Sequence, residues 1–382
     1  MDLFTPLRLG PYTLPNRVLM APLTRNRAGP GNVPGPVNAE YYRQRAGAGL
    51  IITEATQVCP EGQGYPLTPG MHSPAQVEGW KLITEAVHRA GGRIYAQLWH
   101  VGRISHNAYQ PGLAAPVSSS AVAYRGNATL PDFSHQPYPV PRPLETDEIQ
   151  SVIAQFRRGA ENALQAGFDG VELHGANGYL PDQFLRDGVN QRTDRYGGSI
   201  ANRARFHLEA VRALIEVWGP ERIGVRLSPS GTFNGMSDSD PRATFGYLVS
   251  ELSKLRVGYA HIMEAMESDL RHGRDTNPSY EPIPVSYFRP FFKGVIITNS
   301  GFSFEKAQNY LAQGWADAVA FGVQYLANPD LAERFRHMSR GTAIPLNTPD
   351  PESFYGGAEK GYTDYPVLAT ANASADHMKV PT

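Results

Sequence analysis

Residues 170–179 have the sequence GVELHGANGY, which joins a short apolar run to a group of polar and aromatic side chains. The run Gly170–Leu173 has the length and composition of a buried strand. The turn that follows it carries His174, Asn177 and Tyr179. These side chains could form a site beyond the strand end, or His174 and Asn177 could cap the next helix while Tyr179 packs. Local chemistry alone favours neither alternative.

The same unit recurs along the chain, with a helical segment ended by glycine before each of several apolar runs. The predicted helices lie within 38–45, 73–90, 146–166, 199–218, 242–255, 304–313 and 331–335. The predicted strands lie within 17–22, 50–55, 93–98, 170–173, 222–227, 259–263, 294–298 and 318–322. Near-continuous apolar strands that alternate with helices indicate a parallel sheet buried on both faces.

Eight such strands predict a (β/α)8 TIM barrel, with a doubly wound open sheet as the main rival. The segment 7–14 alternates about a Gly-Pro turn and predicts an N-terminal hairpin that closes one end of the barrel. The insertions 100–145 and 264–290 predict extended loops at the C-terminal face, the first a candidate lid and the second polar. We expect one domain over 1–366 and a mobile tail over 367–382.

The composition excludes several classes of protein. The chain has 382 residues, 41% of them hydrophobic, a net charge of −1 and a pI near 6.8. Nothing in that charge suggests a nucleic-acid or anionic-membrane partner. The one cysteine, Cys59, leaves no intramolecular disulfide, and neither a secretory signal nor a membrane-spanning apolar stretch is visible. We expect a soluble, cytoplasmic protein.

Residues at the predicted strand ends should share one site if the protein is an enzyme. Gln97 offers a planar donor and acceptor, or it is a satisfied polar residue of the core. Arg226 needs an anionic or strongly accepting partner, which could instead be Glu54 or Glu172. The turns near Ser300 and Gly322 suit a phosphate, although an ordinary strand-to-helix turn would look similar. The last two strand ends, including Gly301, are therefore a candidate phosphate cradle.

Two other chemistries are disfavoured. His100, His174 and Glu54 could hold a metal only if they met in space, and they lack the paired spacing of a zinc site. A Schiff base needs a lysine inside the barrel, and all six lysines belong to predicted helix surfaces, a strand start or the tail. We therefore expect no metal and no aldolase chemistry.

Ordered motifs across nearly the whole chain resemble the Old Yellow Enzyme family of FMN-dependent ene-reductases. They are the segments 20–25 (MAPLTR), 97–103 (QLWHVGR), 174–180 (HGANGYL), 190–199 (NQRTDRYGGS), 327–331 (ANPDL) and 354–366 (FYGGAEKGYTDYP). The pattern is closest to the bacterial branch with N-ethylmaleimide and pentaerythritol tetranitrate reductases, and the plant 12-oxophytodienoate reductases are nearby.

The resemblance implies FMN over the barrel mouth. It implies Thr24 at the flavin O4 and Arg226 at N1 and O2 of the reduced ring. The implied cofactor-binding residues are Ala21, Pro22, Leu23, Thr24, Ala55, Gln97, His174, Arg226, Ser300, Gly301, Gly322 and Val323. Val323 is a departure, since many relatives carry arginine there to reach the phosphate.

The resemblance also implies the reaction. His174 and Asn177 would bind the carbonyl or nitro oxygen of an activated alkene, and Tyr179 would give a proton to its α-carbon. The implied substrate pocket is lined by Tyr65, Trp99, His174, Asn177 and Tyr355. NADPH or NADH would reduce the flavin. A flavin-binding redox sensor, a nitro or nitrate-ester reductase and a hydrolase without flavin remain alternatives, and the protein could be a monomer or a homodimer.

Overall fold

Parallel strands close into a barrel in the computed structural model of the chain, which describes residues 1–276 and 280–368. In chain order the barrel strands are β3 (Val18–Met20), β4 (Ile51–Ile52), β6 (Ile94–Trp99), β11 (Gly170–His174), β12 (Ile223–Leu227), β13 (Tyr259–Met263), β14 (Val295–Asn299) and β15 (Ala318–Phe321). Leu173 of β11 is in register with Val225 on one side and with Leu98 on the other. Because every barrel strand has two parallel neighbours, the predicted TIM barrel is confirmed and the open sheet is excluded.

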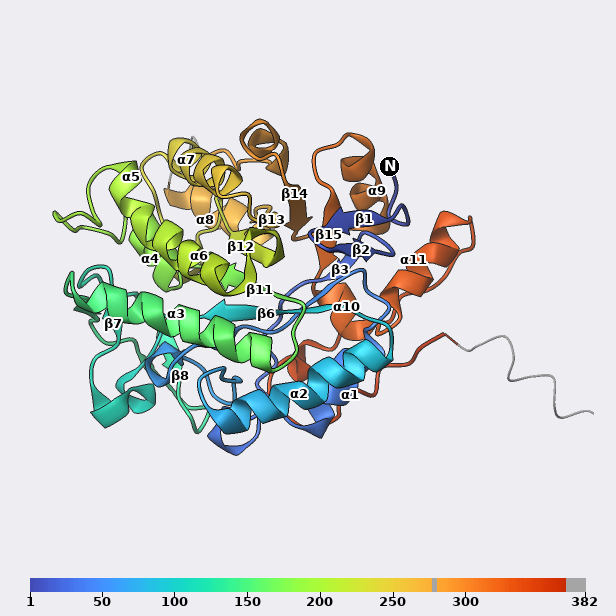
Figure 1. The fold of residues 1–382 in the computed structure, drawn as a ribbon, viewed down its shortest axis with the longest axis horizontal. Helices are drawn as coiled ribbons and strands as arrows, with labels where there is room; N and C mark the ends of the chain where they lie inside the picture. Colours follow the sequence, from blue (N-terminus) through green and yellow to red (C-terminus); the bar gives the residue numbers. More distant parts are fainter. Residues whose placement is uncertain (277–279, 369–382) are drawn as a thin grey trace, which may run out of the picture.

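Helices surround the barrel (Figure 1). They are α1 (Pro36–Gln44), α2 (Pro74–Arg89), α3 (Glu148–Gln165), α4 (Leu180–Leu185), α5 (Ile200–Arg203), α6 (Arg205–Trp218), α7 (Pro241–Lys254), α8 (Glu267–Thr276), α9 (Phe304–Ala312), α10 (Val323–Ala327) and α11 (Leu331–Ser339). Ser73 caps α2 by accepting from the Gln76 N–H, as its position before Pro74 predicts. The prediction of a single helix over 199–218 is wrong, because the segment is divided into α5 and α6 at Ala204, where ψ is −14°.

The predicted N-terminal hairpin is present as β1 (Leu7–Leu9) and β2 (Tyr12–Leu14), which pair antiparallel. Its leucines are buried in one cluster with barrel residues that include Tyr95 and Tyr259. The hydroxyl of Tyr12 also donates to the Asp169 carbonyl, just before β11 begins. The hairpin therefore closes the end of the barrel where the strands start.

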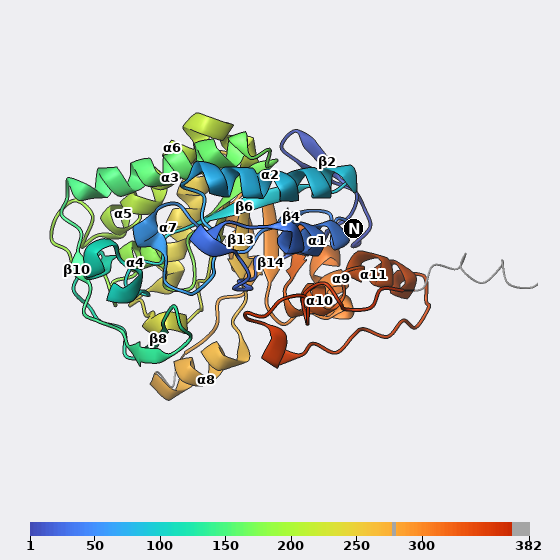
Figure 2. The same cartoon turned by 90° about the horizontal axis from the view of Figure 1, so that it is seen from below.

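The two insertions emerge at the other end. Segment 100–145 forms short strands, β7 (Val117–Ser118), β8 (Asn127–Thr129), β9 (His135–Pro137) and β10 (Arg142–Pro143). Segment 264–290, predicted as a polar loop, contains the helix α8, whose first turn is stabilised where Asp269 accepts from the Met266 N–H. Figure 2 shows β8 and α8 on the same side of the barrel. Both insertions thus lie over one face.

Residues 353–361, here called the C-terminal strap, cross the same face. Arg25 donates to the carbonyl of Gly361 at 2.7 Å, and Arg27 donates to that of Ala358 at 3.0 Å. These bonds fix the strap that carries Tyr355. Of the predicted tail 367–382, residues 369–382 lie outside the described part of the chain. No helix among the described residues is long and apolar enough to cross a membrane.

Candidate active site

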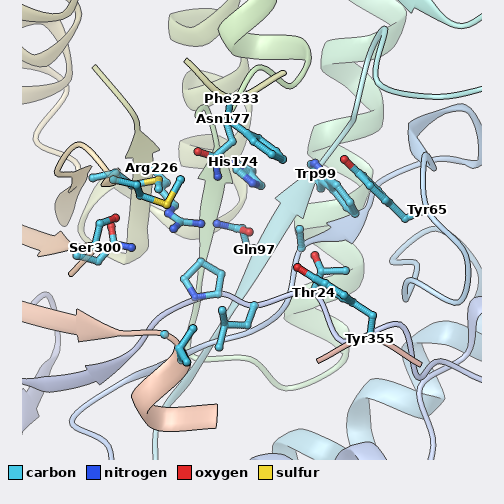
Figure 3. A pocket seen from close by; sticks show the side chains of 18 of the residues that line it. Thr24, Tyr65, Gln97, Trp99, His174, Asn177, Arg226, Phe233, Ser300 and Tyr355 are labelled. Carbon is cyan, nitrogen blue, oxygen red and sulfur yellow. The ribbon is translucent and has the colours of Figure 1, made fainter. Parts of the chain in front are cut away.

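A cavity of about 910 Å³ opens where the barrel strands end, and Figure 3 shows the side chains that line it. It contains nearly all of the predicted site residues. They are Pro22, Leu23, Thr24, Ala55, Tyr65, Gln97, Trp99, His174, Asn177, Tyr179, Arg226, Ser300, Gly301, Gly322, Val323 and Tyr355. Arg226 and Ser300 lie toward one end of the cavity and Tyr65, Trp99 and Tyr355 toward the other.

Ala21 is the predicted site residue that does not line the cavity. Its side chain packs inside the barrel with Leu19 and Ala320, and its backbone N–H donates to the carbonyl of Phe321. Ala21 follows the last residue of β3, so it still belongs to the barrel wall. Pro22, the next residue, is the first of this segment to reach the cavity.

His174 at the end of β11 and the turn that follows it face the cavity and do not cap α4. The N-cap of α4 is Tyr179, without a side-chain capping bond. His174 is 3% exposed, and its Nδ1 has no hydrogen-bond partner. Burial, reinforced by the charge of Arg226, lowers the pKa of His174 well below its ordinary value. His174 is therefore a neutral ring at pH 7, with one N–H to offer a ligand.

Asn177 is held in an unusual backbone conformation. Its φ is +60°, its N–H donates to the hydroxyl of Ser228 at 2.8 Å, and its carbonyl accepts from the Asn234 amide at 2.8 Å. These bonds fix the main chain and leave the side-chain amide of Asn177 at the cavity wall. Asn177 and His174 thus converge there as two polar groups from one turn (Figure 3).

Aromatic side chains form the wall of the cavity at the end away from Ser300 (Figure 3). The rings of Tyr65 and Trp99 are stacked, with centroids 5.7 Å apart and planes at 13°. The edge of Tyr179 meets Trp99 at 5.0 Å, and its hydroxyl oxygen lies 3.2 Å from that of Tyr65. Tyr355 projects from the C-terminal strap and is 64% exposed. Burial raises the pKa of Tyr179 above its ordinary value, so its phenol is protonated at neutral pH.

Arg226 forms an ion pair with neither Glu54 nor Glu172. Glu172 instead accepts from the Gln97 amide at 2.7 Å and from His261 at 2.9 Å. Glu54 accepts from the backbone N–H of Arg25 at 3.2 Å. Within residues 1–276 and 280–368, no ion pair involves Arg226, and its Nε has no hydrogen-bond partner. Because a buried cation without an ion-pair partner is costly, Arg226 favours a ligand that accepts hydrogen bonds from it.

The candidate phosphate cradle has open backbone. Ser300 and Gly301 have φ of +86° and +64°, and a side chain at Gly301 would meet no atom within 4 Å. Val323 begins α10 and is 44% exposed. Lys306 Nζ lies 3.4 Å from the Gly301 carbonyl oxygen, so one cation is close to this turn. An anion could approach the backbone here without displacing side chains.

The described residues contain no group of three or more histidines, cysteines, aspartates or glutamates placed to hold a metal. His100, one of the three side chains considered for such a site, accepts through Nδ1 from the Gly102 N–H and does not line the cavity. Glu54 is also outside the cavity wall. None of the lysines in the described ranges lines the cavity, which leaves no amine there for a Schiff base.

Several lining residues were not predicted. Thr129, Phe133 and His135 come from segment 100–145, Phe233 from the loop after β12, and Met266 from the segment before α8. The predicted lid and polar loop do reach the cavity, but no motif distinguished these side chains from other loop residues. By contrast, Met263 and Asn299, which also line the cavity, were predicted there because they lie at strand ends.

Comparisons with known proteins agree on one family. Residues 2–340 match the model of the NADH:flavin oxidoreductase / NADH oxidase family. The chain is 45% identical to 12-oxophytodienoate reductase 1 of Oryza sativa subsp. japonica over 96% of this chain and 93% of that protein. A structure of morphinone reductase in complex with tetrahydroNAD is 48% identical over 100% of both chains, with a TM-score of 0.88. An old yellow enzyme homologue from Zymomonas mobilis is 43% identical over 96% of this chain and 100% of that chain, with a TM-score of 0.90.

Proposed function

Because the chain belongs to the Old Yellow Enzyme family of flavin oxidoreductases, we propose that it is an FMN-dependent NAD(P)H:enone oxidoreductase. Its substrates in this proposal are small activated alkenes with a carbonyl or nitro group. The observation that carries the proposal is the convergence of His174, Asn177 and Tyr179 on one cavity, next to Arg226, which has no ion-pair partner among the described residues.

The residues present fit FMN. Three residues with groups that a flavin ring edge could satisfy line the cavity: Arg226, Thr24 and Gln97, whose amide nitrogen is bonded to Glu172. The open turn at Gly301 fits the phosphate at the far end. When bound, the flavin supplies the hydride that adds to the β-carbon of the alkene.

In the proposed reaction, the neutral ring of His174 and the amide of Asn177 donate to the carbonyl or nitro oxygen. Their hydrogen bonds withdraw charge from the double bond and stabilise the negative oxygen that develops. Tyr179 gives its proton to the α-carbon. Since burial raises the pKa of Tyr179, the phenol keeps this proton until the substrate becomes basic enough to take it.

The reductant in this proposal is NADPH or NADH, bound in the same cavity before the alkene enters. The similar morphinone reductase structure is a complex with tetrahydroNAD, which supports a nicotinamide as the reductant. The stacked rings of Tyr65 and Trp99 and the exposed Tyr355 offer flat surfaces that suit a nicotinamide as well as an enone.

The test is the visible spectrum of the purified protein without oxygen, recorded after addition of NADPH and again after 2-cyclohexenone. We expect a flavin band that bleaches with NADPH and returns with the enone. A band that bleaches but does not return would support a redox sensor. A protein that takes up no FMN would refute the proposed function.

Tyr179→Phe tests the proposed acid in the same experiment. We expect the return of the flavin band with enone to slow by roughly 100-fold or more, the usual worth of a general acid, and bleaching by NADPH to slow far less. Tyr12→Phe is the matched control, since Tyr12 lies at the closed end of the barrel. Equal slowing of both half-reactions would remove Tyr179 from the acid role.

A further inference from the structure

Phenols from three separate segments lie in series between the cavity and its outer wall. Tyr179 follows β11, Tyr65 follows β5 (Thr56–Gln57), and Tyr138 lies just after β9 in segment 100–145. The hydroxyl oxygens of Tyr179 and Tyr65 are 3.2 Å apart. Tyr65 and Tyr138 pack against the same buried cluster, which contains Trp99 and Tyr179, and each influences the pKa of the other. Tyr179 is buried, whereas Tyr65 and Tyr138 are half-buried. The series therefore leads outward from the proposed acid.

The hydroxyl of Tyr65 is placed to donate to Tyr179 when Tyr179 loses its proton. Either hydroxyl can be the donor in the 3.2 Å contact between the two phenols. Once Tyr179 has given up its proton, its oxygen can only accept, so Tyr65 is then the donor. Burial raises the pKa of both Tyr65 and Tyr179, so both phenols are protonated at neutral pH.

We propose that Tyr138 and Tyr65 form a proton relay that restores the proton given up by Tyr179. The proposal rests on the proposed function, because it takes Tyr179 as the acid. When the O–H bond of Tyr179 breaks, a C–H bond forms at the α-carbon. In the same step the proton of Tyr65 passes to the oxygen of Tyr179; the proton of Tyr138 then passes to Tyr65, and water reprotonates Tyr138. No electrons move along the relay, and one solvent proton enters the product.

The surroundings of Tyr179 explain why a relay is useful. The rings of Trp99 and His174 flank Tyr179 at 5.0 and 4.9 Å, and a bound alkene would cover its remaining open side. A phenolate in this apolar place is costly, since burial disfavours the charged form. Tyr65, whose hydroxyl oxygen is 3.2 Å away, can pass its proton to Tyr179 as Tyr179 gives up its own, so a full phenolate need not form. Tyr65 and Tyr138 are therefore positioning residues that act through Tyr179.

The experiment measures the reoxidation of the NADPH-reduced holoenzyme by 2-cyclohexenone in mixtures of H₂O and D₂O. For the natural chain we expect a curved dependence of rate on deuterium fraction, because more than one proton moves. Tyr65→Phe should slow the step about tenfold, the loss of one hydrogen bond to a developing charge, and make the dependence linear. Tyr138→Phe should act in the same direction with a smaller factor.

Tyr124→Phe is the matched control. The ring of Tyr124 packs 5.4 Å from that of Tyr138, but it does not line the cavity, so the rate and the curvature should stay as in the natural chain. A second measurement follows the tyrosine ¹³Cζ resonances. The Tyr179 signal should shift in Tyr65→Phe and stay in place in Tyr124→Phe.

The relay is overturned if Tyr65→Phe and Tyr138→Phe keep both the natural rate and the curved isotope dependence. It is also overturned if the Tyr179 resonance does not move in Tyr65→Phe. Failure of the proposed function has a different signature, because the natural holoenzyme itself would then not be reoxidised by the enone. The two ideas can therefore fail separately.

Discussion

At the scale of single residues, Glu172 determines which atom of Gln97 faces the cavity. The amide nitrogen of Gln97 donates to Glu172 at 2.7 Å, so the amide oxygen remains as an acceptor. Burial would raise the pKa of Glu172, but His261, the charge of Arg226 and the hydrogen bond from Gln97 together outweigh it and lower that pKa. An anionic carboxylate therefore fixes Gln97, and a ligand edge next to it must present an N–H group.

Val323 leads to a prediction about cofactor affinity. An arginine at this position would add a cation beside the open turn at Gly301, where we place the FMN phosphate. We expect Val323→Arg to lower the dissociation constant of FMN by roughly tenfold, the worth of one charge-assisted hydrogen bond. Quenching of FMN fluorescence by apoprotein measures it, and Val323→Met is the uncharged control. Unchanged affinity in Val323→Arg would place the phosphate elsewhere.

The sequence predicts strand-end residues well and their partners poorly. His174 and Arg226 are predicted at the site because each lies at the C-terminal end of a predicted strand, and that rule needs no three-dimensional information. The pairing of Glu172 with His261 depends on the register of β11, β12 and β13, which a linear pattern does not contain. The sequence does not predict Phe233 at the cavity, because its position there depends on the path of the loop after β12.

At the scale of elements, the C-terminal strap depends on a buried charge cluster. Arg25 and Arg27 donate to strap carbonyls, and Glu54 lies behind them, accepting from Tyr42 and from the backbone of Arg25. The FYGG motif of the strap is visible in the sequence, but its contacts with these arginines are not. They join residues more than 300 positions apart, beyond the range of any local signal.

The pKa of buried Glu54 leads to a prediction about how the stability of the protein depends on pH. Burial raises the pKa of Glu54 from 4.5 to about 7. Between these values the unfolded chain has lost the proton while the folded chain keeps it, so stability falls as pH rises from 4.5 to 7. This loss amounts to about 3 kcal/mol and should be absent in Glu54→Gln. Urea unfolding of both proteins across this range measures the difference, and a difference independent of pH would contradict the assignment.

The helices α8 and α10 show where element prediction failed. The first turn of α8 contains Glu267 and Asp269, which is a helix-start signal, but its polar composition made the segment resemble a loop. Helix α10 has only five residues, too few for an apolar period to be visible. By contrast, α3 and α6 lie within segments that the sequence predicts as helical, because a glycine follows each of them, although α6 begins later than predicted.

At the scale of the whole molecule, large and small residues alternate between neighbouring strands in the closed end of the barrel. Tyr259 of β13 is in register with Gly224 of β12, and Tyr95 of β6 with Gly170 of β11. A Cβ at Gly224 would lie 2.0 Å from the ring of Tyr259, and one at Gly170 would lie 2.4 Å from that of Tyr95. The glycines make room for the tyrosines on which the hairpin packs.

Gly224→Ala should therefore destabilise the entire barrel. Its added methyl group meets a fully buried ring that cannot move aside, and overpacking of this kind costs about 1–3 kcal/mol or more. Because every strand bonds to two others, we expect one cooperative urea transition shifted to lower concentration. Gly47→Ala is the matched control, since a Cβ there meets no atom within 4 Å, and it should be neutral or slightly stabilising. The double variant Gly224→Ala with Tyr259→Leu should recover part of the loss. Equal midpoints for Gly224→Ala and Gly47→Ala would show that the close packing of Tyr259 against Gly224 does not limit the stability of the barrel.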